Sequence, residues 1–61
     1  MKQGNRNKLI SRTNRIEGQI VGIGRMIEDD RCCVEIIDQI AAARSAHSSL
    51  GIELLRSHVE S

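Results

Sequence analysis

Residues 9–27 read LISRTNRIEGQIVGIGRMI, and the spacing of the side chains in this stretch determines the fold that we predict. Six positions recur in alternating steps of four and three residues: Leu9, Thr13, Ile16, Ile20, Ile23 and Ile27. This heptad pattern predicts a helix, from about residue 5 to residue 28, that packs along one side. Thr13 is its one polar member. We attribute Gly18, Gly22 and Gly24 to the close approach of a neighbouring helix, because glycine by itself lowers helix stability.

A second helix is expected after a short turn near residues 29–31. Consecutive acids at 28–30 oppose the dipole at the end of one helix, whereas an aspartate is a good N-cap for the next. We therefore predict a helix from about residue 31 to residue 60. Its apolar positions form a wide stripe: Cys33, Val34, Ile36, Ile37, Ile40, Ala41, Ala43, Leu50, Ile52, Leu54, Leu55 and Val59. A stripe of this width indicates contact with more than one neighbouring helix.

Together the two helices predict an all-α fold, with residues 1–61 forming a single helical domain. The simplest arrangement is an antiparallel helical hairpin. Because the first helix cannot cover the whole of the second, we expect two hairpins to pair as a four-helix-bundle dimer, which then assembles to a tetramer.

The composition also indicates that the chain needs a source of stability beyond its own hydrophobic core. Of 61 residues, 39% are hydrophobic and none is aromatic, so the largest single contributions to a core are missing. The adjacent Cys32 and Cys33 cannot cross-link distant segments, which leaves self-association or a metal as the stabilising factor. A chain this short cannot enclose a substrate pocket, so we expect neither an enzyme nor a small-molecule substrate. With no membrane-spanning run and no apolar leader, we expect a cytoplasmic protein without a membrane partner.

Charge is concentrated at the N-terminal end. The net charge of the chain is +1, yet residues 1–16 contain five basic side chains and no acidic one: Lys2, Arg6, Lys8, Arg12 and Arg15. A basic end can attract polyanions such as nucleic acid, although it can also be a solvated terminus. Lys8, Arg12 and Arg15 are spaced to share one face of the first helix.

Two cysteines and two histidines could carry metal chemistry. Cys33 falls in the first turn of the second helix, where the helix dipole favours a metal-binding thiolate. His58 lies roughly 37 Å further along the same helix, so the two cannot meet within one chain. In an antiparallel dimer, however, the start of one such helix approaches the end of its partner. One dimer would then hold two equivalent sites, each shared between copies.

Spacing alone leaves other interpretations open. A cysteine on an apolar stripe is usually a small buried hydrophobe, and a histidine such as His58 is often only a favourable cation at a helix C-terminus. His47 lies on the same stripe as Ile40 and Leu54, which predicts a packed interior histidine. Cys32 could be a spare thiol, a group beside the metal ligand or a surface residue.

Four runs of sequence resemble the copper-sensitive operon repressor family. They are RIEGQIVGI at residues 15–23, RMIEDDRCC at 25–33, DQIAAAR at 38–44, and ELL at 53–55 followed by His58. The resemblance covers nearly the whole chain, from about Lys8 to His58. Because the runs keep the family's order, they are far more specific than any one motif.

The resemblance implies a bacterial cytosolic transcriptional repressor that binds operator DNA without metal and is released when metal binds. It implies all-helical antiparallel dimers that join into disc-like tetramers. Cu(I) would lie between copies, held by Cys33 of one and by His58 of the other, with a further cysteine four residues after His58. Basic helical surfaces contact DNA in this family, which implies phosphate contacts for Lys8, Arg12, Arg15 and Arg44.

Two parts of the family pattern fall outside these residues, namely the third ligand, at position 62, and a third helix. We expect the chain to continue beyond Ser61. A cysteine at position 62 would indicate copper and a histidine would indicate nickel, cobalt or zinc, since soft thiolates favour Cu(I). Cys32 stands where many members have a tyrosine beside the metal ligand.

Related sensors match less well, which makes Cu(I) the leading inducer. Persulfide sensors lack the histidine that His58 supplies, and formaldehyde sensors have an N-terminal proline where this chain has Lys2. Nickel and cobalt sensors have an extra histidine near the N-terminus. Two other functions stay open: a helical adaptor or oligomerisation module that binds no metal, and a thiol-based redox sensor that uses Cys32 and Cys33.

Overall fold

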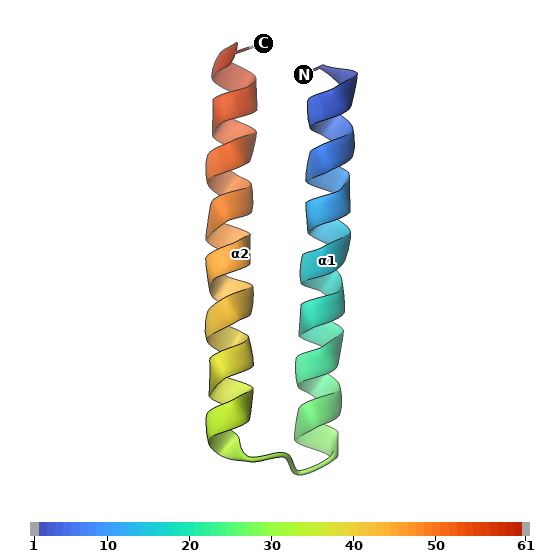
Figure 1. Cartoon of the computed structure of the whole chain (residues 1–61), viewed down its shortest axis with the longest axis vertical. Coiled ribbons are helices and arrows are strands. Elements are labelled where there is room, and N and C mark those ends of the chain that lie inside the picture. Colours follow the sequence, from blue (N-terminus) through green and yellow to red (C-terminus); the bar gives the residue numbers. More distant parts are fainter. Residues whose placement is uncertain (1, 61) are drawn as a thin grey trace.

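The computed structural model describes residues 2–60, which form two long helices and, within that range, no strand. Helix α1 (Gln3–Glu28) and helix α2 (Cys33–Glu60) run antiparallel, so that the first turn of α1 lies at the same end as the last turn of α2 (Figure 1). The hairpin extends over 45 × 15 × 9 Å. The predicted all-α hairpin is confirmed. Its helices begin at residues 3 and 33, where the pattern had predicted about 5 and 31.

The turn between the helices is a Schellman motif closed by an aspartate. The backbone N–H of Arg31 donates to the carbonyl of Met26 at 3.0 Å, and that of Asp30 donates to Ile27 at 3.2 Å. Asp30 has a φ of 54°, the left-handed conformation that this motif requires and that glycine usually supplies. The predicted N-cap role for an aspartate is therefore wrong. Asp30 ends α1, while α2 begins one residue after Cys32, whose carbonyl accepts the N–H of Ile36 at 3.2 Å.

An ion pair bridges the turn and the first turn of α2. The guanidinium of Arg31 contacts the carboxylate of Glu35 at 2.9 Å, and its Nε donates to the same oxygen at 3.0 Å. The carboxylate of Glu35 also lies near the positive end of the α2 dipole. Because both side chains are exposed, the pair contributes no more than about 0.5 kcal/mol.

The two helices contact each other along a line of mostly small or polar side chains. On α1 the half-buried positions repeat with heptad spacing: Asn5, Leu9, Arg12, Ile16, Gln19, Ile23 and Met26. Opposite them on α2 lie Ile36, Ala43, Ala46, Leu50, Glu53 and Ser57. Among the described residues only Ala43 and Ser57 are buried, with 4% and 8% of their surface exposed. The hairpin therefore holds only a small core.

This contact line corrects the predicted seam of α1. Leu9, Ile16 and Ile23 do face α2, but Ile20 and Ile27 are 56% and 57% exposed. The predicted residues straddle the contact line, so half of them lie on the open flank of the helix. Thr13 is exposed as well, and its hydroxyl donates to the carbonyl of Leu9 at 2.8 Å.

The glycines of α1 are not explained by packing inside the hairpin. A Cβ built on Gly18, Gly22 or Gly24 would meet nothing within 4 Å. The close approach that we predicted for them therefore does not occur between α1 and α2. Gly18 and Gly24 are exposed in the single chain, and Gly22 is half-buried.

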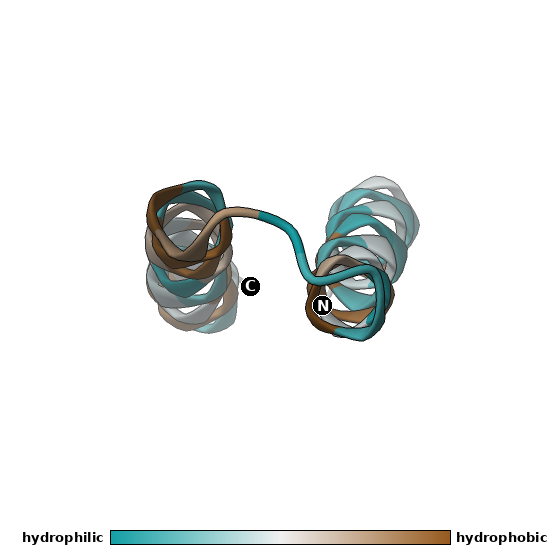
Figure 2. Cartoon of the chain, turned by 90° about the horizontal axis from the view of Figure 1, so that it is seen from below, coloured by the Kyte–Doolittle hydropathy of each residue, from teal (hydrophilic) through white to brown (hydrophobic). Residues whose placement is uncertain are grey.

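One chain leaves an unusually large surface exposed. Its accessible surface is 4909 Å², whereas a compact monomer of this mass exposes about 3,950 Å². Eleven large apolar side chains are exposed: Ile10, Ile20, Val21, Ile27, Val34, Ile37, Ile40, Ile52, Leu54, Leu55 and Val59. Hydrophobic residues, drawn in brown, accordingly lie on more than the facing sides of the two helices (Figure 2). Neither described helix is both long enough and apolar enough to cross a membrane.

The aspartate in the turn gives a stability test. Replacing Asp30 by glycine should raise the free energy of unfolding by about 0.5–1 kcal/mol, because glycine adopts a positive φ without steric cost. Thermal unfolding at one fixed protein concentration measures the change. Asp29→Gly is the matched control, since Asp29 has a φ of −86° and should only lose stability. Equal shifts for both variants would contradict the Schellman assignment.

Candidate functional site

Both thiols lie at the turn end of the hairpin. Cys33 is the first residue of α2 and Cys32 immediately precedes it. Both cysteines are free thiols and both are exposed. Cys33 is therefore not buried within one chain, and its sulfur is accessible to a metal there.

His58 lies at the opposite end of the same helix. It is exposed in the last turn of α2, and α2 is continuous from Cys33 to Glu60. At about 1.5 Å of rise per residue, Cys33 and His58 are roughly 37 Å apart along the helix axis. Within the described chain, no group of three or more His, Cys, Asp or Glu side chains could hold a metal ion. A site that uses both residues must therefore include a second copy.

Cys33 and His58 are the two ends of one exposed line on α2, which we call the open stripe. Its members follow each other in steps of four and three residues: Cys33, Ile37, Ile40, Arg44, His47, Gly51, Leu54 and His58. All eight are exposed in the single chain. The stripe lies beside the line that contacts α1, so α2 presents a second surface suited to a helix.

An apolar groove of about 400 Å³ runs beside the middle of the open stripe. One wall is formed by three isoleucines of α1, namely Ile16, Ile20 and Ile23. The other wall is formed by residues of α2, namely Ile40, Ala43, Arg44 and His47. His47 is exposed at this groove, so a single hairpin does not bury it and the predicted interior position would require a second copy. It lies one position beyond Ala46, which is the residue that faces α1.

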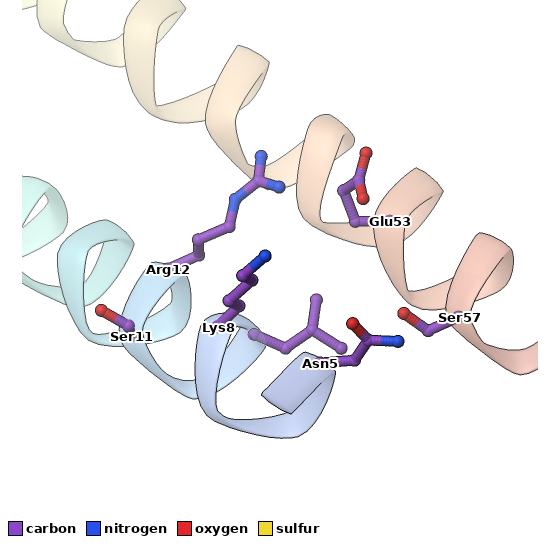
Figure 3. A pocket seen from close by; sticks show the side chains of 7 residues that line it. Asn5, Lys8, Ser11, Arg12, Glu53 and Ser57 are labelled. Carbon is purple, nitrogen blue, oxygen red and sulfur yellow. The ribbon is translucent and has the colours of Figure 1, made fainter. Parts of the chain in front are cut away.

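A second, polar cleft of about 270 Å³ lies between the helices at the end where the chain starts. Lys8 and Arg12 extend from α1 toward α2, and Glu53 and Ser57 lie across from them (Figure 3). Asn5, Leu9 and Ser11 complete its lining. Glu53 is the acidic member, and it accepts a hydrogen bond from Arg56 at 3.2 Å. The cleft therefore combines two cationic side chains with one partly neutralised carboxylate.

The structure groups only some of the predicted DNA-contacting residues. Lys8 and Arg12 share the polar cleft, and Arg15 is exposed one turn further along α1. Arg44 belongs to the other helix and lines the apolar groove with His47. The basic surface of the single chain is therefore the α1 group.

The sequence interpretation missed Glu53 and Ser57. Both lie on the side of α2 that contacts α1, in a line that includes Ala43, Ala46 and Leu50. That line has heptad spacing and could have been found in the sequence. This contact line was not recognised because it overlaps the wide apolar stripe of α2. Apolar residues alone do not show which edge of a wide stripe faces the neighbouring helix.

Comparison with known proteins identifies the family. Residues 5–61 match the family described as "Metal-sensitive transcriptional repressor". The chain belongs to this family. This membership confirms the family resemblance predicted over about Lys8 to His58.

Two curated members of the metal-sensitive repressor family are similar over most of this chain. The copper-sensing transcriptional repressor RicR of Mycobacterium tuberculosis is 46% identical over 48 residues, which are 79% of this chain and 50% of the relative. The copper-sensing transcriptional repressor CsoR of Bacillus subtilis is 42% identical over 53 residues, which are 87% of this chain and 52% of the relative. The chain therefore spans about half the length of the curated relatives it matches.

A solved repressor structure has the same helical arrangement. The crystal structure of the copper-sensing repressor CsoR with Cu(I) from Geobacillus thermodenitrificans NG80-2 matches with a TM-score of 0.90 and 35% sequence identity. The match covers 98% of this chain and 62% of that one. The hairpin thus has the fold of the matching part of that repressor chain.

The acidic residue of the polar cleft offers a test of its charge. Replacing Glu53 by glutamine should strengthen binding to heparin about two- to fivefold at low salt, because Lys8 and Arg12 lose a nearby carboxylate. Salt elution from immobilised heparin measures this. Glu28→Gln changes the net charge equally at the other end of α1 and should have a smaller effect. An equal effect of both variants would show that the cleft has no special part in anion binding.

Proposed function

We propose that this member of the metal-sensitive repressor family represses transcription by binding operator DNA in its metal-free form and leaves the DNA when Cu(I) binds. One observation carries the proposal. Cys33 and His58 terminate the same exposed stripe of one continuous helix, so that two antiparallel copies can bring the cysteine of one to the histidine of the other.

Pairing of two copies is supported by the surface that one chain exposes. The chain exposes about 950 Å² more than a compact monomer of its mass, and most of its large apolar side chains contribute to that surface. Chains of this size usually need oligomerisation, a metal or disulfides for a stable fold. A four-helix-bundle dimer covers the open stripe and the flank of α1 that carries Ile20 and Ile27. Further apolar positions on α2, such as Ile52 and Val59, support assembly of dimers into a tetramer.

The donor set at the proposed shared site fits a soft metal ion. Cys33 supplies a thiolate and His58 an imidazole, and thiolates select Cu(I) over harder ions. The copper-sensing relatives and the Cu(I)-bound structure support copper over nickel, cobalt and zinc. When bound, the metal supplies a cross-link between two copies. By symmetry, each dimer has two such sites.

The basic face of α1 is the proposed DNA contact. Lys8, Arg12 and Arg15 lie on it, and the first turn of α1 has no acidic residue. Contacts of this kind with phosphates release counterions, and the affinity therefore falls steeply with salt. Several copies in one assembly repeat the face. Because a repressor must reach the chromosome, we place the protein in the cytoplasm.

The polar cleft gives a physical connection between the metal and the DNA. Ser57 is buried against α1 and directly precedes His58, while Lys8 and Arg12 line the same cleft from α1. A metal that fixes His58 therefore acts on the part of α2 that positions these cations. By linkage, DNA must weaken metal binding by the same factor, typically 1–3 kcal/mol.

A mixed dimer tests whether the metal site is shared. Neither the Cys33→Ala nor the His58→Ala homodimer retains a complete site, so both should lose tight Cu(I) binding. A heterodimer of the two variants, purified through different tags, rebuilds one site and should recover about half of the wild-type Cu(I) capacity. Anaerobic competition with a Cu(I) chelator measures this. A heterodimer that binds no better than its parents contradicts a shared site.

The same variants separate metal sensing from DNA binding. Cys33→Ala should bind an operator fragment as the wild type does but should no longer be released by Cu(I) in a gel-shift assay. Cys32→Ser is the matched control and should keep the response. Release of the Cys33→Ala protein by Cu(I) would exclude Cys33 as a ligand. Release of the wild type by oxidant without metal would favour the redox alternative.

The salt dependence of DNA binding tests the basic face. Lys8→Ala and Arg15→Ala should each lower the slope of log affinity against log salt by about one per lost phosphate contact. Fluorescence anisotropy with an operator fragment measures the slope. Arg25→Ala is the control, because Arg25 is an exposed cation in the last turn of α1, far from this face. A slope change for Arg25→Ala alone would place the DNA at the other end of the hairpin.

A further inference from the structure

The open stripe of α2 is symmetric about its own midpoint, which falls between Ser45 and Ala46. Cys33 and His58 lie equally far from this point. The same is true of each inner pair: Ile37 with Leu54, Ile40 with Gly51, and Arg44 with His47. A stripe with this symmetry is complementary to itself when a second copy lies against it in the opposite direction, as a two-fold interface requires.

From this symmetry we infer that Arg44 and His47 form the polar centre of the interface between two copies, with Arg44 of each copy opposite His47 of the other. The inference rests on the proposed function for one element, the register in which Cys33 lies opposite His58. Once that register is set, every inner pair follows from the spacing of the stripe. The remaining pairs are then complementary: Ile37 lies opposite Leu54, and the large Ile40 lies opposite the small Gly51.

The chemistry of the central pair favours this arrangement. A guanidinium has only donors, and a neutral imidazole offers one ring nitrogen as an acceptor, so that Arg44 can donate to His47 of the other copy. A parallel arrangement would instead bring Arg44 against Arg44, which like charges oppose. A single polar layer of this kind inside an apolar seam specifies register and orientation, at some cost in stability.

The glycine of the stripe supports the same register. A Cβ built on Gly51 would meet nothing within 4 Å in the single chain, so packing against α1 does not require a glycine there. Opposite Ile40 of a second copy, however, the missing side chain leaves room for a large one. Ile37 and Leu54 form the next layer, in which both side chains are apolar and exposed in one chain.

The exposed area has the size that a second copy needs. The excess over a compact monomer, about 950 Å², is close to the roughly 800 Å² that each partner buries in a standard interface. The apolar groove beside the stripe adds Ile16, Ile20 and Ile23 of α1 to this surface. A second copy is therefore the occupant that we assign to it.

His47 is the acceptor available to Arg44 at the centre of this interface. The groups that face His47 are Arg44 of its own helix, three isoleucines of α1, and, in the inferred dimer, Arg44 and His47 of the second copy. None of these is an acid. Loss of the imidazole would therefore leave a guanidinium without a partner at the interface, which is costly.

Disulfide trapping tests the register without metal or DNA. In a Cys32→Ser/Cys33→Ser background, Ile37→Cys together with Leu54→Cys should give a disulfide-linked dimer on mild oxidation. Ile37→Cys alone is the matched control. It should remain monomeric on a denaturing gel, because the two new thiols lie about 25 Å apart in the antiparallel register. Trapping by the single variant, or none by the double variant, would overturn the register.

Sedimentation equilibrium of the metal-free protein tests the central pair. Arg44→Ala and His47→Ala should each raise the dimer dissociation constant, and the double variant should raise it by less than the product of the two single effects, because both substitutions remove the same contact. His58→Ala combined with Arg44→Ala is the matched control and should show independent effects. Independent effects of Arg44→Ala and His47→Ala overturn the assignment. Because neither experiment uses metal or operator, failure here is distinguishable from failure of Cu(I)-dependent release.

Discussion

Two helices of this length expose more apolar surface than they can cover for each other, and the small side chains between them are one reason. Ala43, Ala46 and Ser57 let α2 approach α1, but they bury little area. Many of the large residues, such as Ile20, Ile37 and Leu55, lie on the flanks. A hairpin with this distribution gains little hydrophobic stabilisation from its own core, and chains of this size usually draw further stabilisation from other chains, a metal or disulfides. In the proposed dimer, folding and assembly would therefore be coupled.

The same constraint determines where metal chemistry can occur. A small hairpin has no enclosed interior in which to collect several ligands, and α2 is too straight to bring its two ends together. The proposed interface between antiparallel copies would solve both problems, since it would bring the start of one α2 to the end of the other. A ligand placed at each end of one helix then gives two complete pairs per dimer. Metal binding in such a site would depend on the relative position of the two copies. A DNA-binding assembly must change that relative position in order to change its affinity for DNA.

Much of the fold was predictable because heptad spacing is a local signal. The alternation of Leu9, Ile16 and Ile23 with their neighbours predicted α1, and the apolar stripe predicted α2. The partner of each position was harder to predict. Ile20 differs from Ile23 only in the direction that it takes around the helix, and a sequence does not show where a neighbouring helix lies within a wide stripe. The role of Glu53 in the polar cleft was missed for the same reason.

Asp30 shows a second kind of limit. An aspartate beside a helix end satisfies the sequence signals for an N-cap and for a left-handed C-cap, and only the backbone path decides between them. The ligand pair had no such ambiguity, because the distance from Cys33 to His58 follows from helix length alone.

The centre of the open stripe explains how Cys33 of one copy and His58 of the other can be held opposite each other in a single register. If two copies slipped by one heptad, each cysteine would move about 10 Å from its histidine while most apolar contacts were replaced by equivalent ones. Apolar layers alone therefore do not protect the ligand pairs. Arg44 and His47 differ from the isoleucines and leucines around them because a slipped register would bury them without each other, and burial of an unpaired guanidinium is costly. In the proposed dimer, the polar residues at the middle of the stripe would thus hold the proposed metal ligands at its ends in register.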